Sequence, residues 1–158
     1  MEEVKKLLGL LQNEKEEKKP FVLFFTLAAY TGCRKGELLG AEWKDFDFDN
    51  NTFSIQRGYY YDCFNHTHYT DTPKTKTSRR TLKLPAHIME TLKEYRQRQN
   101  TRREICGGSW VETDRIFTTW KGETMPTTSP KNFLQSFCKR TEMREVNIHS
   151  FRHFNAIG

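Results

Sequence analysis

An apolar run at residues 21–30, FVLFFTLAAY, constrains the fold of this chain more than any other feature of its sequence. A helix on the surface of a domain carries apolar side chains on one face, whereas this run is apolar nearly all round. It therefore predicts a helix buried at the centre of a domain, and the Thr31-Gly32 pair marks its end.

The length and the aromatic content fit one soluble domain. A chain of 158 residues suffices for one core and is short for two, and its 12 Phe, 6 Tyr and 3 Trp can bury a substantial area. Met1 leads into charged residues, and no apolar run reaches the roughly 18 residues of a membrane span. We therefore expect a cytoplasmic protein without leader or membrane segment. The four cysteines form no C-x-x-C pair, which favours reduced thiols.

Apolar periodicity divides the rest of the chain into helices and strands. Helical spacing covers residues 2–12, 34–43, 85–100, a segment from 129 and a last segment from about 149. Alternation predicts strands at 46–48 and 53–55 around an Asp-Asn-Asn turn, and further strands at 81–84 and 114–119. Residues 59–72 indicate a second strand or an insertion, and their register stays open.

The positive charge is concentrated in one part of the chain. The net charge is +6, and residues 57–103 hold 11 Lys and Arg against 4 acidic residues, whereas residues 1–19 are balanced. A concentrated basic segment favours a polyanion partner, because each neutralised phosphate releases condensed counterions. A solvated basic face is the equally weighted alternative.

Three residues outside this segment could act on a phosphate. Arg34 follows a Thr-Gly-Cys turn, where backbone donors and a guanidinium could together hold a phosphate group. His149 and Arg152 are three residues apart and share one helix face. With a lysine, such groups would neutralise charge on a phosphodiester and move protons without a metal. The alternatives are that Arg34 pairs with Glu37 and that His149 caps a helix.

Other catalytic arrangements fail on spacing. His149 and His153 are four residues apart like a zinc pair, but the H-E-x-x-H glutamate is missing. No elbow or oxyanion-loop signature surrounds Cys33 or Cys138, so a cysteine nucleophile is not indicated. We expect neither a metal nor a cofactor.

Three motifs in order resemble the catalytic domain of tyrosine recombinases, the phage and conjugative-transposon integrase family. They are AAYTGCRKGELLGAEWKDFDF at 28–48, TPKTKTSRRTLKLP at 72–85 and NIHSFRH at 147–153. The resemblance covers essentially all of residues 1–158 as a single domain. It implies an α+β, mainly helical fold with a small antiparallel β-sheet. It also implies site-specific DNA recombination, the integration or excision of a mobile element, through a 3′-phosphotyrosine.

The resemblance assigns roles to the phosphate-binding residues. Arg34 matches the first catalytic arginine of the family, and His149 and Arg152 match its H-x-x-R pair. Glu37 matches an acidic position that we interpret as orienting Arg34.

The family also has a lysine on a hairpin, which acts as general acid for the leaving 5′ oxygen. It falls on Lys74, with Lys76 as the alternative, because the P-K-T context and the offset to Arg79 favour Lys74. We expect Lys76, Arg79 and Arg80 to contact DNA. If neither lysine is catalytic, both are simply solvated.

The family's nucleophilic tyrosine lies beyond the H-x-x-R motif, and none of the six residues after Arg152 is a tyrosine. We therefore interpret the sequence as a partial catalytic domain, inactive alone, whose full-length parent forms a homo-tetramer on double-stranded DNA. The alternative is a non-catalytic basic DNA-binding module or degenerate integrase remnant. A basic protein-interaction domain is a third, weaker interpretation.

Overall fold

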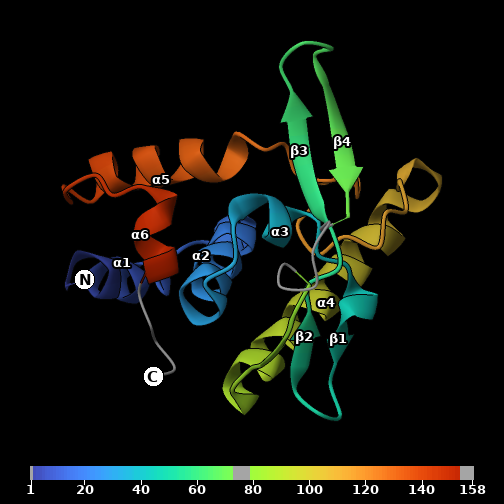
Figure 1. Ribbon diagram of the computed structural model, residues 1–158, viewed down its shortest axis with the longest axis horizontal. Coiled ribbons are helices and arrows are strands. Elements are labelled where there is room, and N and C mark those ends of the chain that lie inside the picture. Colours follow the sequence, from blue (N-terminus) through green and yellow to red (C-terminus); the bar gives the residue numbers. More distant parts are fainter. Residues whose placement is uncertain (1, 73–78, 154–158) are drawn as a thin grey trace. The chain divides into compact units, whose positions relative to one another are not determined.

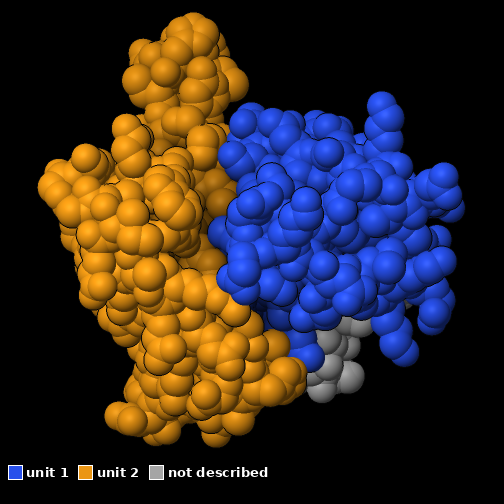
Figure 2. Space-filling model, turned by 180° about the vertical axis from the view of Figure 1, so that it is seen from behind, with its two compact units in different colours: residues 1–35, 128–158 blue, residues 36–127 orange. Residues whose placement is uncertain are grey.

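The computed structural model describes residues 2–72 and 79–153, and Figure 1 gives the order of their helices and strands. The chain divides into two compact units, residues 1–35 with 128–158, and residues 36–127 (Figure 2). The organisation of the chain as a single domain stays a prediction. None of the described helices is both long and apolar enough to cross a membrane.

The first unit is helical. It contains α1 (Glu2–Leu11), the short 3-10 helix η1 (Glu16–Lys18), α2 (Lys19–Thr31), α5 (Ser129–Arg140) and α6 (Ile148–His153). Helix α2 is the predicted apolar helix, and most of its residues from Val22 to Ala29 are buried. Pro20 lies in its first turn, where the missing N–H of proline costs no hydrogen bond.

Aromatic contacts hold α5 and α6 against α2. The rings of Phe21 and Phe133 stack with centroids 4.5 Å apart, which joins α2 to α5. The rings of Phe25 and Phe151 lie 4.8 Å apart, and Phe151 is fully buried. A six-residue helix such as α6 is too short to be stable alone, so its position depends on this packing.

The second unit contains two antiparallel sheets and one long helix. Its elements are η2 (Trp43–Asp45), β1 (Phe46–Asp47), β2 (Thr52–Ser54), β3 (Gly58–Asp62), β4 (Thr67–Asp71), β5 (Thr81–Lys83), α4 (Ala86–Cys106) and η3 (Gly107–Ser109). Strands β1, β2 and β5 form one sheet in that order, and β3 and β4 form the other. The predicted mainly helical fold with small antiparallel sheets is confirmed.

Residues 59–72, whose register the sequence leaves open, form the hairpin β3–β4. The Asp62 carboxylate closes its turn by accepting hydrogen bonds from the backbone N–H groups of Phe64 and Asn65, at 2.9 and 3.3 Å. Tyr60 pairs with Tyr69 across the two strands. The phenyl ring of Phe64 at the tip is 95% exposed.

Two predicted boundaries are wrong. The helix expected over 34–43 is the short helix α3 (Lys35–Leu39), which stops where Gly40 approaches Gly58. A Cβ atom at Gly40 would lie 3.1 Å from the Gly58 backbone, so the close approach favours glycine. Helix α4 runs past residue 100 to Cys106, because polar residues continue a helix well and Gly107, with φ of +53°, ends it.

The strand predicted at 114–119 is also wrong. Over this segment the structure has only isolated bridges, Glu42 with Arg115 and Thr118 with Thr124. Residues 115–118 are all buried, and the Gln99 side-chain amide donates hydrogen bonds of 3.1 Å each to the backbone carbonyls of Arg115 and Ile116. A side chain of helix α4 therefore donates the hydrogen bonds that the backbone of a neighbouring strand would otherwise donate.

Candidate functional site

The turn before Arg34 is fixed by its own hydrogen bonds. Gly32 ends α2 with φ of +68°, and its N–H donates to the Ala28 carbonyl at 3.0 Å. The Thr31 hydroxyl accepts the Cys33 N–H at 3.1 Å. Cys33 is fully buried and Arg34 is exposed, so the turn presents Arg34 at the start of α3.

Helix α6 is joined to this turn through Arg152. Its Nε donates a hydrogen bond of 2.8 Å to the Gly32 carbonyl oxygen. The bond connects the H-x-x-R motif with the turn that precedes Arg34, although 120 residues separate the two partners. The guanidinium keeps its terminal nitrogens for other acceptors, because only Nε is used in this bond.

The alternative role of His149 as a helix cap is wrong. Asn147 caps α6, since its side-chain oxygen accepts the backbone N–H of Ser150 at 3.1 Å. His149 is exposed in the first turn of the helix. Its imidazole is therefore not needed for the fold of α6.

A pocket of about 300 Å³ in the first unit brings His149 and Arg152 together. Lys35 and Lys131 also line it, as does the carboxylate residue Glu145. Burial, followed by repulsion from Lys131, lowers the pKa of Lys35. The sequence patterns do not predict either lysine as a site residue. The one sequence feature that could have identified Lys35 as a site residue is its position next to Arg34. No sequence feature identifies Lys131.

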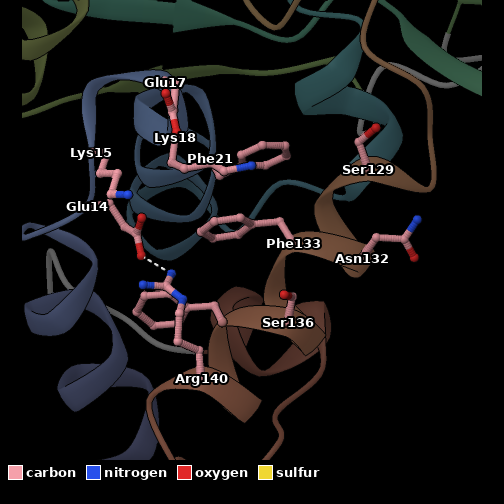
Figure 3. A pocket seen from close by; sticks show the side chains of 11 residues that line it. Glu14, Lys15, Glu17, Lys18, Phe21, Ser129, Asn132, Phe133, Ser136 and Arg140 are labelled. Atoms are coloured by element: carbon pink, nitrogen blue, oxygen red, sulfur yellow. Dashed lines mark hydrogen bonds and ion pairs between the residues drawn. The ribbon is translucent and has the colours of Figure 1, made fainter.

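A larger pocket of about 510 Å³ in the same unit holds none of the predicted site residues (Figure 3). Aromatic rings of Phe21, Phe133 and Phe137 form its apolar part. An ion pair between Glu14 and Arg140 lies at its edge. Its positive charge is partly neutralised within the fold, which makes it a poorer anion site than the pocket at α6.

Glu37 lies at the start of the second unit, and the structure pairs it with Arg80. The Glu37 carboxylate is buried and lies 3.5 Å from the Arg80 guanidinium. The carbonyl of Arg80 accepts the Ile55 N–H at 2.8 Å. The orienting role of Glu37 toward Arg34 and the DNA contact of Arg80 stay predictions.

The predicted lysines Lys74 and Lys76 lie outside the described residues. Arg79, which follows them, is exposed. The structure instead describes the two ends between which the lysine segment runs, at β4 and at Arg80. Both ends are held by buried charged groups.

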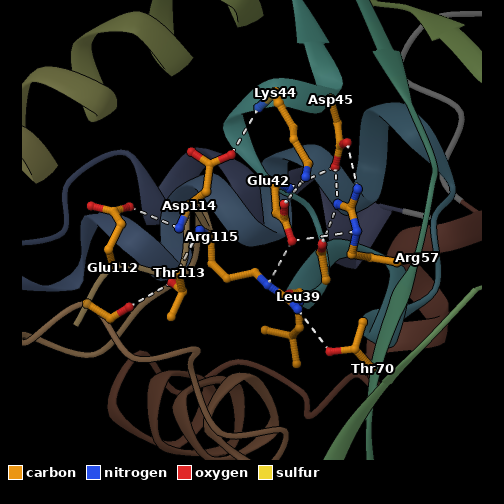
Figure 4. A network of polar contacts seen from close by, with 12 residues as sticks. Leu39, Glu42, Lys44, Asp45, Arg57, Thr70, Glu112, Thr113, Asp114 and Arg115 are labelled. Atoms are coloured by element: carbon orange, nitrogen blue, oxygen red, sulfur yellow. Dashed lines mark hydrogen bonds and ion pairs between the residues drawn. The ribbon is translucent and has the colours of Figure 1, made fainter.

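A network of charged side chains holds the β4 end (Figure 4). The Arg57 guanidinium donates to Asp45 at 2.6 Å and lies 3.5 Å from Glu42. Glu42 also lies 3.4 Å from the Nε of Arg115. Charges removed from water in this way are tolerated because each has a partner of opposite sign.

Within this network, Arg115 also contacts residues of α3 and of β4. It donates to the Leu39 carbonyl at 3.3 Å and to the Thr70 hydroxyl at 2.9 Å, and its guanidinium lies over the Tyr59 ring. Burial lowers the pKa of Arg115, although the nearby carboxylates of Glu42 and Asp45 oppose this effect. Arg115 thus ties the end of α3 to β4, one residue before that strand ends at Asp71.

Within the described residues no group of three or more His, Cys, Asp or Glu side chains is placed to hold a metal ion. The four cysteines form no disulfide bond within the described residues, and Cys33 and Cys138 are buried. The turn before Arg34 and the pocket at α6 present guanidinium, ammonium and imidazole groups.

The helices around α2, the H-x-x-R motif on α6 and the small antiparallel sheets define the catalytic-domain fold of tyrosine recombinases. The chain belongs to the phage integrase family, whose family model matches residues 1–157.

Two relatives and two solved structures illustrate the likeness. A XerC-like tyrosine recombinase of Caldanaerobacter subterraneus subsp. tengcongensis is 31% identical over 162 residues, and the ICEBs1 integrase of Bacillus subtilis is 26% identical over 156 residues. Each match covers 96% of this chain and 40% of the relative.

Among solved structures, the Tn1549 transposon integrase in complex with transposon right end DNA superposes with a TM-score of 0.73 at 18% identity. This match covers 95% of this chain and 49% of that chain. The XerA recombinase gives a TM-score of 0.69 at 17% identity, covering 97% of this chain and 47% of that one. These structures establish the fold, and the chain spans less than half the length of the relatives it matches.

Proposed function

We propose that the protein containing this chain carries out site-specific DNA recombination, integrating or excising a mobile element through a 3′-phosphotyrosine intermediate. In this proposal Arg34, His149 and Arg152 bind the scissile phosphate. The observation that carries it is the 2.8 Å hydrogen bond from Arg152 to Gly32, because it joins the H-x-x-R helix to the turn before Arg34.

The chemistry of these groups suits a phosphodiester. Guanidinium groups donate parallel hydrogen bonds to two phosphate oxygens and stay charged at any physiological pH. Fixed cations stabilise charge that develops on the non-bridging oxygens during attack. The imidazole of His149 can add a hydrogen bond to a phosphate oxygen or move a proton.

The general acid in this proposal is Lys74, or Lys76 as the alternative. Anchored ends support such a role for the segment between β4 and β5. Arg115 bonds Thr70 at one end, and Arg80 is paired with Glu37 and bonded to Ile55 at the other. Arg79 and Arg80, with Lys76, would then contact the DNA backbone.

The nucleophile in this proposal comes from outside the 158 residues. No tyrosine follows Arg152, which is where the family's order of motifs puts it. The working assembly is a homo-tetramer on double-stranded DNA, with this chain as a single partial catalytic domain in each subunit.

The test uses a recombination-competent protein that contains this chain and a nicked suicide substrate. Arg34→Ala and Arg152→Ala should each reduce the covalent protein-DNA adduct by about 10²-fold or more, the usual scale for losing one electrostatic stabiliser. Arg144→Ala is the matched control, because this arginine is exposed and lies outside the pocket at α6.

The same experiment separates the alternatives. Salt-sensitive DNA binding without any adduct would favour a non-catalytic DNA-binding module. Absence of DNA binding would favour a basic protein-interaction domain. Adduct levels that are unchanged in both arginine variants would rule out the proposed phosphate site.

A further inference from the structure

The pocket at α6 contains two lysines to which the proposed mechanism gives no role. Lys35 directly follows Arg34 and is half-buried, whereas Lys131 is exposed in the first turn of α5. Both line the pocket of about 300 Å³ into which His149 and Arg152 also face. Lys35 and Lys131, which are nearly 100 positions apart in the sequence, therefore line the same cavity.

The charge of this pocket is not balanced by the fold. Three of its lining residues, Lys35, Lys131 and Arg152, are cationic, and Glu145 is the one carboxylate among them. No ion pair joins either lysine to a carboxylate of the described residues. The two ammonium groups instead repel each other, and burial together with this repulsion lowers the pKa of Lys35.

Such an arrangement is unfavourable until an anion enters. Like charges held close together raise the free energy of the unliganded state, and a partly buried ammonium has lost hydration that an anion would replace. The larger pocket of Figure 3 differs, because its Arg140 is already paired with Glu14. The cationic pocket is therefore the better anion site.

The residues that line the pocket, together with its volume, indicate which kind of anion would fit. Leu134, Val146 and Ile148 line it beside the cations, so it offers apolar surface as well as charge. Its volume lies at the small end of the range for ligand sites, about 300 to 1,000 Å³. A phosphate that carries a sugar fits both the charge and the apolar walls better than a bare inorganic anion.

We propose that Lys35 and Lys131 bind a second phosphate of the DNA backbone, the neighbour of the phosphate held by Arg34, His149 and Arg152. The proposal rests on the proposed function. Arg152 lines the pocket and belongs to the scissile-phosphate site, so the two sites share a boundary. Phosphates recur about every 3.4 Å of helix axis along one strand, which brings a neighbouring phosphate to such a boundary.

In this role the two lysines are positioning residues. Contacts to phosphates carry no base information, but they fix the register of the protein on the strand. Holding the neighbouring phosphate would set which phosphodiester lies against Arg34 and Arg152. The lysines therefore act on binding and register, and the chemical step is left to the other groups.

The experiment measures binding of this chain to a short duplex of mixed sequence over a range of salt concentrations. The double variant Lys35→Gln and Lys131→Gln should bind about tenfold more weakly, the scale of a lost charge-assisted hydrogen bond. Its slope of log affinity against log salt should fall by about 1, as expected for one phosphate contact. The Lys35→Arg and Lys131→Arg variant should restore the slope.

Lys139→Gln is the matched control, because Lys139 is exposed on the same helix as Lys131 but does not line the pocket. A second arm adds inorganic phosphate and records thermal unfolding, which also verifies that every variant folds. The inference is overturned if the double variant keeps the affinity and slope of the unmodified chain. It is equally overturned if inorganic phosphate stabilises the chain through these lysines while duplex binding ignores them.

Failure of this inference is distinguishable from failure of the proposed function. The function is judged by the covalent adduct in the recombination-competent protein, in which Arg34 and Arg152 are changed. The phosphate subsite is judged by the salt slope of duplex binding, in which only Lys35 and Lys131 are changed.

Discussion

Single side chains decide whether the H-x-x-R motif is held in place. Helix α6 has six residues, and its Phe151 is fully buried with its ring against that of Phe25. Arg152 adds the hydrogen bond to Gly32. The chemistry of the motif therefore depends on an apolar residue between His149 and Arg152.

Phe151→Ala should destabilise the chain by about 3 to 5 kcal/mol, the usual cost of truncating a buried phenylalanine. The measurement is the free energy of unfolding from denaturant titration. Phe64→Ala is the control, because this ring is 95% exposed, and it should change stability by less than about 0.5 kcal/mol. Equal effects of the two substitutions would contradict the packing described for α6.

Arg115 has a comparable role in the second unit. Arg115→Met keeps an unbranched apolar stem but removes the donors to Leu39 and Thr70, and it leaves Glu42 with fewer partners. We expect a loss of about 2 to 4 kcal/mol, since a buried charge pair is broken from one side. Hydrogen exchange of the β4 amides should increase together with this loss. Protected β4 amides in the variant would show that other contacts hold the hairpin.

The elements that the sequence predicts best are those with one dominant pattern. The apolar run at 21–30 forms the buried helix α2, and the alternation around residues 46–55 forms the β1–β2 hairpin. Errors occur where a tertiary contact replaces a local one. The segment 114–119 is predicted to be a strand, but the Gln99 amide donates to two of its carbonyls, those of Arg115 and Ile116, to which a neighbouring strand would otherwise donate.

The candidate site was predictable only in part, because some of its residues are brought together by tertiary packing that no local sequence pattern shows. Motif resemblance singles out Arg34, His149 and Arg152, because they lie in recognisable sequence contexts. Lys131 has no such context, and only the tertiary structure shows that it lines a pocket with residues of α6. The network of Arg57 and Arg115 is likewise set by burial, which no local pattern reveals.

Gly32 ends helix α2 and begins the turn before Arg34. Gly32→Ala should destabilise the chain by about 1 to 2 kcal/mol, because its φ of +68° is a left-handed conformation that costs other residues this much. Space is not the cause, since an added Cβ would lie 3.5 Å from the Arg152 carbonyl, an ordinary contact.

Gly9→Ala is the opposite control. Gly9 lies inside α1 with nothing within 4 Å of an added Cβ, so alanine should stabilise the chain by about 0.5 to 1 kcal/mol. Thermal or denaturant unfolding of both variants measures the two signs. A stabilising Gly32→Ala would show that the turn before Arg34 is not left-handed in solution.

Many of the basic side chains of residues 57–103 already interact with carboxylates or aromatic rings of the protein. Carboxylates of the same unit pair with at least four of these side chains: Arg57, Arg80, Lys93 and Arg103. The guanidinium groups of Arg96 and Arg102 lie over tryptophan rings. The net charge of the segment therefore overstates what is available to a polyanion.

We expect this chain to bind duplex DNA weakly, with little sequence preference and a steep loss of affinity as salt rises. The dependence should nevertheless be shallower than 11 basic residues would suggest, because the paired ones release no counterions. Fluorescence polarisation with two unrelated duplexes at several salt concentrations measures both features. Affinity that does not change between low and physiological salt would contradict the electrostatic interpretation.

The 158-residue chain alone should form no covalent adduct with DNA. Cations activate a phosphodiester, but covalent catalysis also needs a hydroxyl in line with the leaving oxygen. No tyrosine follows Arg152 in this sequence. Tyr95 is 3% exposed and burial raises the pKa of its hydroxyl, while Tyr59 is half-buried beneath the Arg115 guanidinium.

The measurement is incubation of the chain with a nicked suicide substrate, followed by denaturing electrophoresis. An adduct should form only when a carboxy-terminal segment carrying a tyrosine is supplied, and it should disappear when that tyrosine is changed to phenylalanine. An adduct that maps to any tyrosine from Tyr30 to Tyr95 would overturn the roles proposed here, because the nucleophile would then precede the H-x-x-R motif.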